Sequence, residues 1–376
     1  MKVIIVADNL GGGSARLGRA LIEALAKKIG WHSLIVLGNA RLGLNSHDKL
    51  KCIKYLELKS DWTPRFLKRH IFVRKYTKDA VILNLTNFPI GTIFLGAQKE
   101  LCLLHNAYFF TVPPDIRSLG LKFILRDILA RRFIFHFLNL FSASLKTEFI
   151  VQTPWMKKLV QKSLPAKFKL ESAKLHGWPH CKISDDKEIS FNQKINIGKN
   201  IIWFYPATGE PHKNHALLYK MFAKALKRQP QMKLIVTLPF GQAFSLKLTA
   251  LSKTLGIDNS IINVGWIQED QKNYLLKKCS GIVFLSEFES LGLPLLEIRE
   301  LNKKAIVIKS NASEYILGNG SHIFDLRSKN ISQRKKEQER FVKVLSSNPI
   351  PDFEYGKNNF TSIDDAYFFD WIGGNS

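Results

Sequence analysis

Short apolar runs alternate with helical patterns from the first residues of the chain onward. The runs show little alternation of polar and apolar side chains, which is typical of parallel strands buried on both faces of a sheet. In the first half, strands are expected at 3–7, 33–37, 80–85, 101–104 and 149–152, and helices at 14–28, 120–140 and 155–163. This half is therefore predicted to be a Rossmann-like domain.

A polar, irregular stretch at 179–199 predicts an interdomain linker, and a second series of strands and helices follows it. Its strands are expected at 201–205, 234–238, 261–264, 282–285 and 305–308, and its helices at 214–226, 244–255, 270–278 and 294–301. The pattern predicts an α/β protein of two Rossmann-like, doubly wound domains that face each other across a cleft. We expect an N-terminal Rossmann-like domain at 1–182 and a C-terminal Rossmann-like domain at 195–345. The charged, then aromatic, tail predicts a final helix, with 346–376 packing back toward the N-terminal domain.

Composition narrows the class of protein. Hydrophobic residues make up 45% and charged residues 23% of the 376 positions, as in an ordinary globular protein. The net charge of +25 predicts a polyanionic neighbour, such as a phosphorylated substrate, an anionic membrane surface or nucleic acid. Four widely spaced cysteines, no signal peptide and an apolar stretch at 120–145 interrupted by charges favour a cytoplasmic protein without a transmembrane segment.

The strongest candidate site is SEFESLGLPLLEIRE, which follows the apolar strand GIVFL. Backbone N–H groups from Ser290 through Leu291, Gly292 and Leu293 would stand at a helix N-terminus, where they could hold a diphosphate. Glu289 and Glu297 flank this position, and their carboxylates could accept hydrogen bonds from sugar and ribose hydroxyls. The alternative is that Glu289 caps the helix and Glu297 lies on its solvated face.

A cation is expected near this anion site. Lys213, in PATGEPHKNH, follows the first strand of the same domain and could neutralise a departing diphosphate. The alternative is a solvated lysine at the start of a helix.

In the first half, Gly12 and Gly13 belong to a glycine loop between the first strand and the first helix, where the backbone could approach a ligand closely. A tight turn without a ligand explains these glycines equally well. His105 and Asn106 end another strand, which aims their polar side chains at the expected cleft. A buried, structural histidine is the alternative there.

The second half resembles the retaining glycosyltransferases of family 4, which have the GT-B fold. The E-x7-E element of that family is matched by Glu289 and Glu297, and its phosphate-binding lysine by Lys213. The resemblance implies that the domain at 195–345 binds a nucleotide-sugar donor and that the domain at 1–182 binds the acceptor. Within the donor domain, it implies that Glu289 binds the donor sugar, that Glu297 binds the ribose, and that the backbone at 291–293 holds the pyrophosphate. It also favours a donor contact for the glycine loop and for His105.

One departure from this family concerns the positive charge at the phosphates. Many members carry an arginine before the lysine, whereas this chain has Ala207, Thr208 and Gly209 there, with His212 as a possible helper. The predicted catalytic residues are His105, Lys213 and Glu289. The predicted donor-binding residues are Gly12, Gly13, Asn106, His212, Ser290, Leu291, Gly292, Leu293 and Glu297.

No cofactor or metal is expected, since the lysine and the helix terminus supply the positive charge. HGWPHC at 176–181 is interpreted as a loop rather than a metal site.

Basic and aromatic residues are interleaved at 62–78 and 121–141, which suits an anionic membrane surface and a lipid-linked acceptor. One alternative is that the apolar positions pack in the core and the charges are solvated. The other is nucleic-acid binding, for which the sequence has no recognisable module.

The resulting hypothesis is a nucleotide-sugar-dependent transferase for lipopolysaccharide, O-antigen or another polysaccharide, at the cytoplasmic face of the inner membrane. The alternative is a noncatalytic nucleotide-sugar or polyanion-binding protein.

Overall fold

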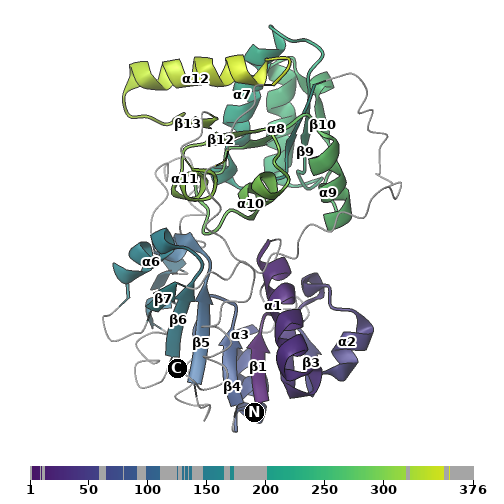
Figure 1. The fold of residues 1–376 in the computed structure, drawn as a ribbon, viewed down its shortest axis with the longest axis vertical. Coiled ribbons are helices and arrows are strands. Elements are labelled where there is room, and N and C mark those ends of the chain that lie inside the picture. Colours follow the sequence, from purple (N-terminus) through teal and green to yellow (C-terminus); the bar gives the residue numbers. More distant parts are fainter. Residues whose placement is uncertain are drawn as a thin grey trace. The chain divides into compact units, whose positions relative to one another are not determined.

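The computed structural model contains two compact units, which divide at residues 180–181 (Figure 1). The structure describes residues 2–8, 10, 13–58, 65–78, 80–90, 99–110, 125, 129–130, 132–133, 135–137, 147–164, 170–172, 201–318, 322–350 and 355. Each unit is built on one parallel sheet, and each is described by itself.

The first unit holds a seven-stranded sheet of order β3-β2-β1-β4-β5-β6-β7, in which every pair of neighbours is parallel. The order reverses beside β1, because the chain passes from β3 at one edge back to β4 on the other side of β1. The strands are β1 (Lys2–Val6), β2 (Leu34–Gly38), β3 (Lys54–Glu57), β4 (Ala80–Asn84), β5 (Lys99–Leu104), β6 (Thr147–Val151) and β7 (Leu170–Ser172).

Helices cover both faces of this sheet. Successive residues of a strand point to opposite faces, so Val3 of β1 packs with Leu21 of one helix, whereas Ile4 packs with Val73 of another. These two helices are α1 (Gly13–Ile29) and α3 (Arg65–Tyr76), and the unit also contains α2 (Ser46–Lys51), α6 (Pro154–Gln161), η1 (Trp31–Ser33), η2 (Ala40–Leu42) and η4 (Ala107–Phe109).

The second unit holds a six-stranded parallel sheet of order β10-β9-β8-β11-β12-β13. Its strands are β8 (Ile202–Tyr205), β9 (Lys233–Val236), β10 (Ile261–Asn263), β11 (Gly281–Phe284), β12 (Ala305–Ile308) and β13 (Ile323–Phe324). Its helices are α7 (His215–Leu226), α8 (Ala243–Thr254), α9 (Glu269–Lys278), α10 (Leu293–Glu300), α11 (Asn311–Leu317) and α12 (Ile331–Leu345), with short turns η8 (Pro211–Lys213) and η9 (Asp258–Ser260). Two doubly wound α/β units of this kind confirm the predicted fold class.

The charged segment after Asn330 forms α12, which packs against α7. Its polar face is exposed, while Phe341 and Leu345 are buried, and the indole N–H of Trp203 donates to the carbonyl of Leu345 at 3.0 Å. The helix is therefore part of the second unit.

The apolar runs located every strand that they predicted, within two residues at each end. Three strands, β3, β7 and β13, were not predicted, because they are short and lie at or beside sheet edges. The predicted linker at 179–199 lies outside the described residues, as do most of the predicted helix at 120–140 and most of the C-terminal segment 346–376.

Candidate active site

Two loops of the second unit leave neighbouring strands at the same edge of its sheet. One follows β8 and contains Lys213, and the other follows β11 and contains Glu289. The loops are joined through their backbones, because the N–H of Glu287 donates to the carbonyl of His212 at 3.2 Å. The amide of Asn214 adds a second link by donating to the carbonyl of Leu285 at 2.9 Å. The strand order thus brings the two strongest sequence motifs together.

Lys213 and Glu289 form an ion pair between the two loops. Their side chains keep 16% and 17% of their surfaces exposed, so the pair is accessible rather than sealed. Burial by itself raises the pKa of Glu289. The charge of the Lys213 ammonium group and its hydrogen bond lower this pKa by more than burial raises it, so the net pKa lies below the ordinary value. Glu289 is therefore ionised at neutral pH, and it holds the Lys213 ammonium group next to the loop that leads into α10.

That helix, α10, begins with a glycine in the left-handed region. Gly292 is the N-cap residue, with φ 77° and ψ 57°, and as a glycine it has no side chain that could cap the helix. The N-cap of α10 is therefore Gly292 and not Glu289, whose carboxylate pairs with Lys213 instead. A Cβ at this position would also approach Cδ1 of Leu295 to 3.0 Å, a tight contact with the end of a flexible side chain, so the backbone angle is the main reason why glycine is favoured here. At the start of α10, Pro294 has no N–H, and the N–H of Leu295 donates to the carbonyl of Gly292 at 2.8 Å. The backbone N–H groups of Gly292 and Leu293 are therefore the ones at this terminus that are candidates for a ligand contact.

Glu297 lies one turn inside α10, and its side chain is 1% exposed. It forms an ion pair with Lys272 of α9, whose side chain is 21% exposed. The interpretation of Glu297 as a residue of a solvated helix face is therefore wrong. Its predicted contact with a ribose stays a prediction, and Lys272 is a neighbour that sequence reasoning missed.

A further set of residues supports the loop of Lys213. Arg327, which follows β13, donates to the amide oxygen of Asn214 at 2.7 Å and forms an ion pair with Glu287 at 2.8 Å. Asn214 itself has a left-handed backbone with φ 56° and begins α7. None of these three residues was predicted, and the only local signal was an asparagine directly before a helix.

His212 lies beside the lysine in the same loop. Burial, and after it the neighbouring Lys213, lower the pKa of His212 to about 3. The imidazole is therefore neutral at physiological pH and cannot add a positive charge to a phosphate, although it can donate a hydrogen bond.

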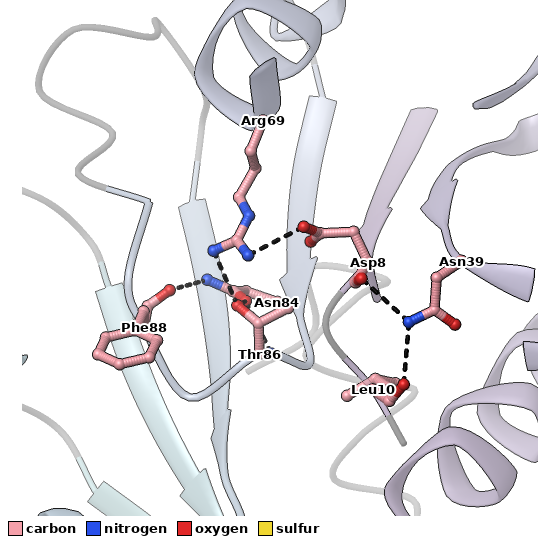
Figure 2. Close-up of polar contacts among 7 residues, drawn as sticks. All are labelled: Asp8, Leu10, Asn39, Arg69, Asn84, Thr86 and Phe88. Carbon is pink, nitrogen blue, oxygen red and sulfur yellow. Dashed lines mark hydrogen bonds and ion pairs between the residues drawn. The ribbon is translucent and has the colours of Figure 1, made fainter. Parts of the chain in front are cut away.

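In the first unit, the loop after β1 is held by Asn39, which directly follows the neighbouring strand β2. The amide of Asn39 donates to the carbonyls of Asp8 and Leu10 at 3.0 and 2.9 Å (Figure 2). This loop leads to the predicted glycine site, where Gly13 is the first residue of α1. Gly12 lies outside the described residues.

His105 and Asn106 follow β5 at the carboxyl edge of the first sheet, as predicted. Their backbone N–H groups both donate to the side-chain oxygen of Asn87, at 2.6 and 2.9 Å. Burial lowers the pKa of His105 to about 4, so its ring is neutral at physiological pH.

In the described ranges, no three His, Cys, Asp or Glu side chains come together in a way that could hold a metal ion. Cys52, Cys102 and Cys279 are buried free thiols. The HGWPHC segment lies outside the described residues. Among the described helices, none combines the length and apolar character needed to cross a lipid bilayer.

Comparison with known families identifies the second unit. Residues 185–345 match the family model of glycosyl transferases group 1. The C-terminal unit is a glycosyltransferase group 1 domain. The prediction of a glycosyltransferase enzyme is thereby confirmed, and this domain contains Lys213, Glu289 and Glu297. No curated protein matches the chain.

Solved structures with a similar fold include HepE of Anabaena in complex with UDP and glucose. It shares 12% identity over 100% of both chains with a TM-score of 0.62. A glycosyltransferase from Rickettsia africae shares 14% identity over 100% of this chain and 99% of its own, with a TM-score of 0.58. The lipopolysaccharide outer core galactosyltransferase WaaB shares 12% identity over 100% of both chains, with a TM-score of 0.55. At these identities the likeness establishes the GT-B fold.

Proposed function

We propose that the glycosyltransferase domain binds the diphosphate of a nucleotide sugar between Lys213 and the N-terminus of α10, and that the chain transfers the sugar to a glycan or glycolipid. The observation that carries this proposal is the accessible ion pair between Lys213 and Glu289. Glu289 belongs to the loop that ends at Gly292, the left-handed N-cap residue of α10. An ammonium group, a carboxylate and the backbone N–H groups of Gly292 and Leu293 at a helix N-terminus are the complement of a sugar diphosphate. A uridine diphosphate donor is the first choice, since HepE binds UDP.

In this proposal the ion pair is exchanged when the donor binds. Lys213 turns from the carboxylate to the phosphate oxygens, where negative charge develops as the bond to the anomeric carbon breaks. Glu289 then accepts hydrogen bonds from hydroxyls of the sugar. Because both groups start paired and ionised, neither has to gain or lose a proton.

Glu297 is proposed to accept hydrogen bonds from the ribose, with Lys272 holding its carboxylate in place. The resemblance to family 4 supports transfer with retention of anomeric configuration. Retention here means attack on the same face of the sugar, with the leaving phosphate accepting the proton of the acceptor hydroxyl. No metal ion is assigned to the reaction, because Lys213 and the terminus of α10 supply positive charge where the phosphates would lie.

A screen of nucleotide sugars tests the donor site. A true donor at a hundred times its Kd stabilises the folded chain by about 2.7 kcal/mol. We expect a raised Tm with one uridine diphosphate sugar, in EDTA as well as in its absence, and no rise for Glu289→Ala. If no nucleotide sugar raises the Tm of the unmodified chain, the proposed function is wrong. A rise that disappears in EDTA and returns with added metal would contradict metal independence.

The acceptor is proposed to be lipid-linked and to be met at an anionic membrane surface, at the cytoplasmic face of the inner membrane. Four large apolar side chains from the segment 125–137 support this, since Leu125, Leu129, Phe133 and Phe137 are 53%, 51%, 70% and 47% exposed. Phe135, in contrast, is buried and stacks on Phe109 at 5.9 Å. Apolar side chains within a basic stretch are typical of helices that bind membrane surfaces.

Vesicle sedimentation tests this surface. The double variant Phe133→Ser, Phe137→Ser should bind vesicles containing anionic lipid several-fold more weakly than the unmodified chain. Leu246→Ser, which removes an equally exposed leucine of α8, is the control and should bind unchanged. Unchanged binding by the double variant would contradict the proposal, and displacement of the chain from vesicles by an oligonucleotide would favour nucleic acid instead.

A further inference from the structure

His105 has a neighbour, Asn87, that determines how its ring is protonated. The side-chain oxygen of Asn87 accepts the backbone N–H groups of His105 and Asn106, at 2.6 and 2.9 Å. Two N–H donors facing one atom identify that atom as the oxygen, because the amide NH2 group cannot accept. The NH2 group of Asn87 must therefore be the atom that lies 3.0 Å from Nε2 of His105.

An amide NH2 group can only donate, so Nε2 of His105 must accept. A ring nitrogen that accepts a hydrogen bond carries no proton, and the single proton of a neutral imidazole is then on Nδ1. Nδ1 is a buried atom with no hydrogen-bond partner in the described part of the chain. Burial lowers the pKa of His105 to about 4, which agrees with a ring that is neutral at physiological pH.

The turn that carries Asn87 is fixed by an unusually complete set of hydrogen bonds. The side-chain oxygen of Asn84 accepts both the N–H and the hydroxyl of Thr86, at 3.0 and 2.8 Å, and its NH2 group donates to the carbonyl of Phe88 (Figure 2). Arg69 of α3 donates to the hydroxyl of Thr86 at 3.2 Å. The turn places Asn87 in the left-handed region, with φ 67°, and its side chain is buried.

We propose that Asn87 is a positioning residue that holds His105 as the neutral tautomer with its proton on Nδ1, so that the ring keeps one N–H donor and no positive charge at physiological pH. This tautomer does not depend on the proposed function. A left-handed asparagine is tolerated at a small cost, because its short polar side chain bonds locally. The cost at Asn87 is offset by three hydrogen bonds to the residues that end β5.

The tautomer can be measured in the full chain without any ligand. With 15N-labelled histidine, two-bond 1H–15N correlation spectra distinguish a protonated from an unprotonated ring nitrogen. The chain has ten histidines, so the His105 signals are assigned as those missing from His105→Gln. We expect a protonated Nδ1 and an unprotonated Nε2 from about pH 5.5 to about pH 8.5. A protonated Nε2, or a ring that titrates near its ordinary pKa, would overturn the proposal.

Substitution of Asn87 tests the cause. In Asn87→Asp the backbone N–H groups keep an acceptor, but Nε2 now faces a carboxylate oxygen, so Nε2 should become protonated and the pKa of His105 should rise. Asn87→Gly keeps the left-handed backbone without a side chain, and it should give a mixture of tautomers even if the Asp variant does not fold. Asn330→Asp is the control, since this exposed helix cap tolerates either residue, and it should leave the His105 pattern unchanged. An unaltered pattern in both Asn87 variants would show that Asn87 does not control the ring.

Discussion

Each unit has an ion pair after the first strand of its sheet, and the two pairs differ in what surrounds them. In the first unit, Asp8 follows β1 and pairs with Arg69 at 3.1 Å, with side chains 0% and 7% exposed. In the second unit, Lys213 follows β8 and pairs with Glu289, with side chains 16% and 17% exposed. The first pair is sealed among protein groups, whereas the second remains accessible. Similar chemistry at equivalent strand ends is therefore closed to solvent in one unit and partly open to it in the other.

The surroundings of Arg69 support the structural interpretation of the sealed pair. Its guanidinium contacts both Asp8 and Thr86, so it joins the ends of β1 and β4 to α3 (Figure 2). Oδ1 of Asp8 and Nε of Arg69 are nevertheless buried without a hydrogen-bond partner in the described ranges. A buried pair whose remaining polar atoms are unsatisfied gives little net stability, but it is costly to break on one side only.

The largest expected effect is therefore on folding, at Arg69. Arg69→Met should destabilise the chain by about 3–5 kcal/mol, because it leaves the Asp8 carboxylate buried without its cation. The double variant Asp8→Asn, Arg69→Met should recover most of this loss, since no uncompensated charge remains. Urea denaturation of the three chains measures both quantities. A double variant as unstable as the single one would mean that the arginine acts through its packing and not through its charge.

For the accessible pair of Lys213 and Glu289, substitution should reduce activity strongly and stability only slightly. Lys213→Ala should lower kcat for sugar transfer by about 10²–10³, the usual result of removing a group that stabilises transition-state charge. Its free energy of unfolding should fall by only about 1 kcal/mol, because an accessible ion pair contributes little.

Lys220→Ala, on the exposed face of α7, is the matched control and should leave both quantities unchanged. The prediction would be contradicted if Lys213→Ala lost as much free energy of unfolding as Arg69→Met and kept its kcat. Lys213 would then be a structural residue and not part of the donor site.

The same contrast explains how much could be predicted from the sequence. All described strands except β3, β7 and β13 were predictable, because strands buried on both faces must be apolar along their length. Lys213 and Glu289 were predictable too, since each closely follows such a strand and parallel strands end at one edge. Their pairing needed only the order of β8 and β11 in the sheet.

The partners of the charged residues were not predictable. Arg69 lies 61 positions from Asp8 and Lys272 lies 25 from Glu297. Each of these cations comes from a helix that also has two exposed basic residues, Arg74 and Lys75 in α3 and Lys277 and Lys278 in α9. The local sequence does not distinguish a basic side chain that pairs with a buried carboxylate from one that stays exposed to water. Asn87 was missed for a related reason, because its role depends on a left-handed turn that brings it to β5. Glycine and asparagine tolerate that backbone, but most asparagines never adopt it.

The smallest expected effect concerns the pH dependence of the accessible pair. The pKa of Glu289 is lower in the folded chain than its ordinary value, so ionised Glu289 favours folding. For a carboxyl group with a lowered pKa, this stability is fully present above the ordinary pKa of about 4.3 and is lost as pH falls through the folded value. The difference in free energy of unfolding between the unmodified chain and Glu289→Gln should therefore be constant from about pH 5.5 to about pH 8, near 1 kcal/mol, and shrink below about pH 4.

Urea denaturation at several pH values measures this difference, with Glu314→Gln as the control. Glu314 also pairs with a lysine, Lys309, but at 3.5 Å and with side chains 38% and 52% exposed, so its difference should be close to zero throughout. A Glu289 difference that grows as the pH falls would mean that burial outweighs Lys213. The carboxyl group would then be protonated more readily than usual, and an ionised Glu289 could not be the group that holds the ammonium in front of α10.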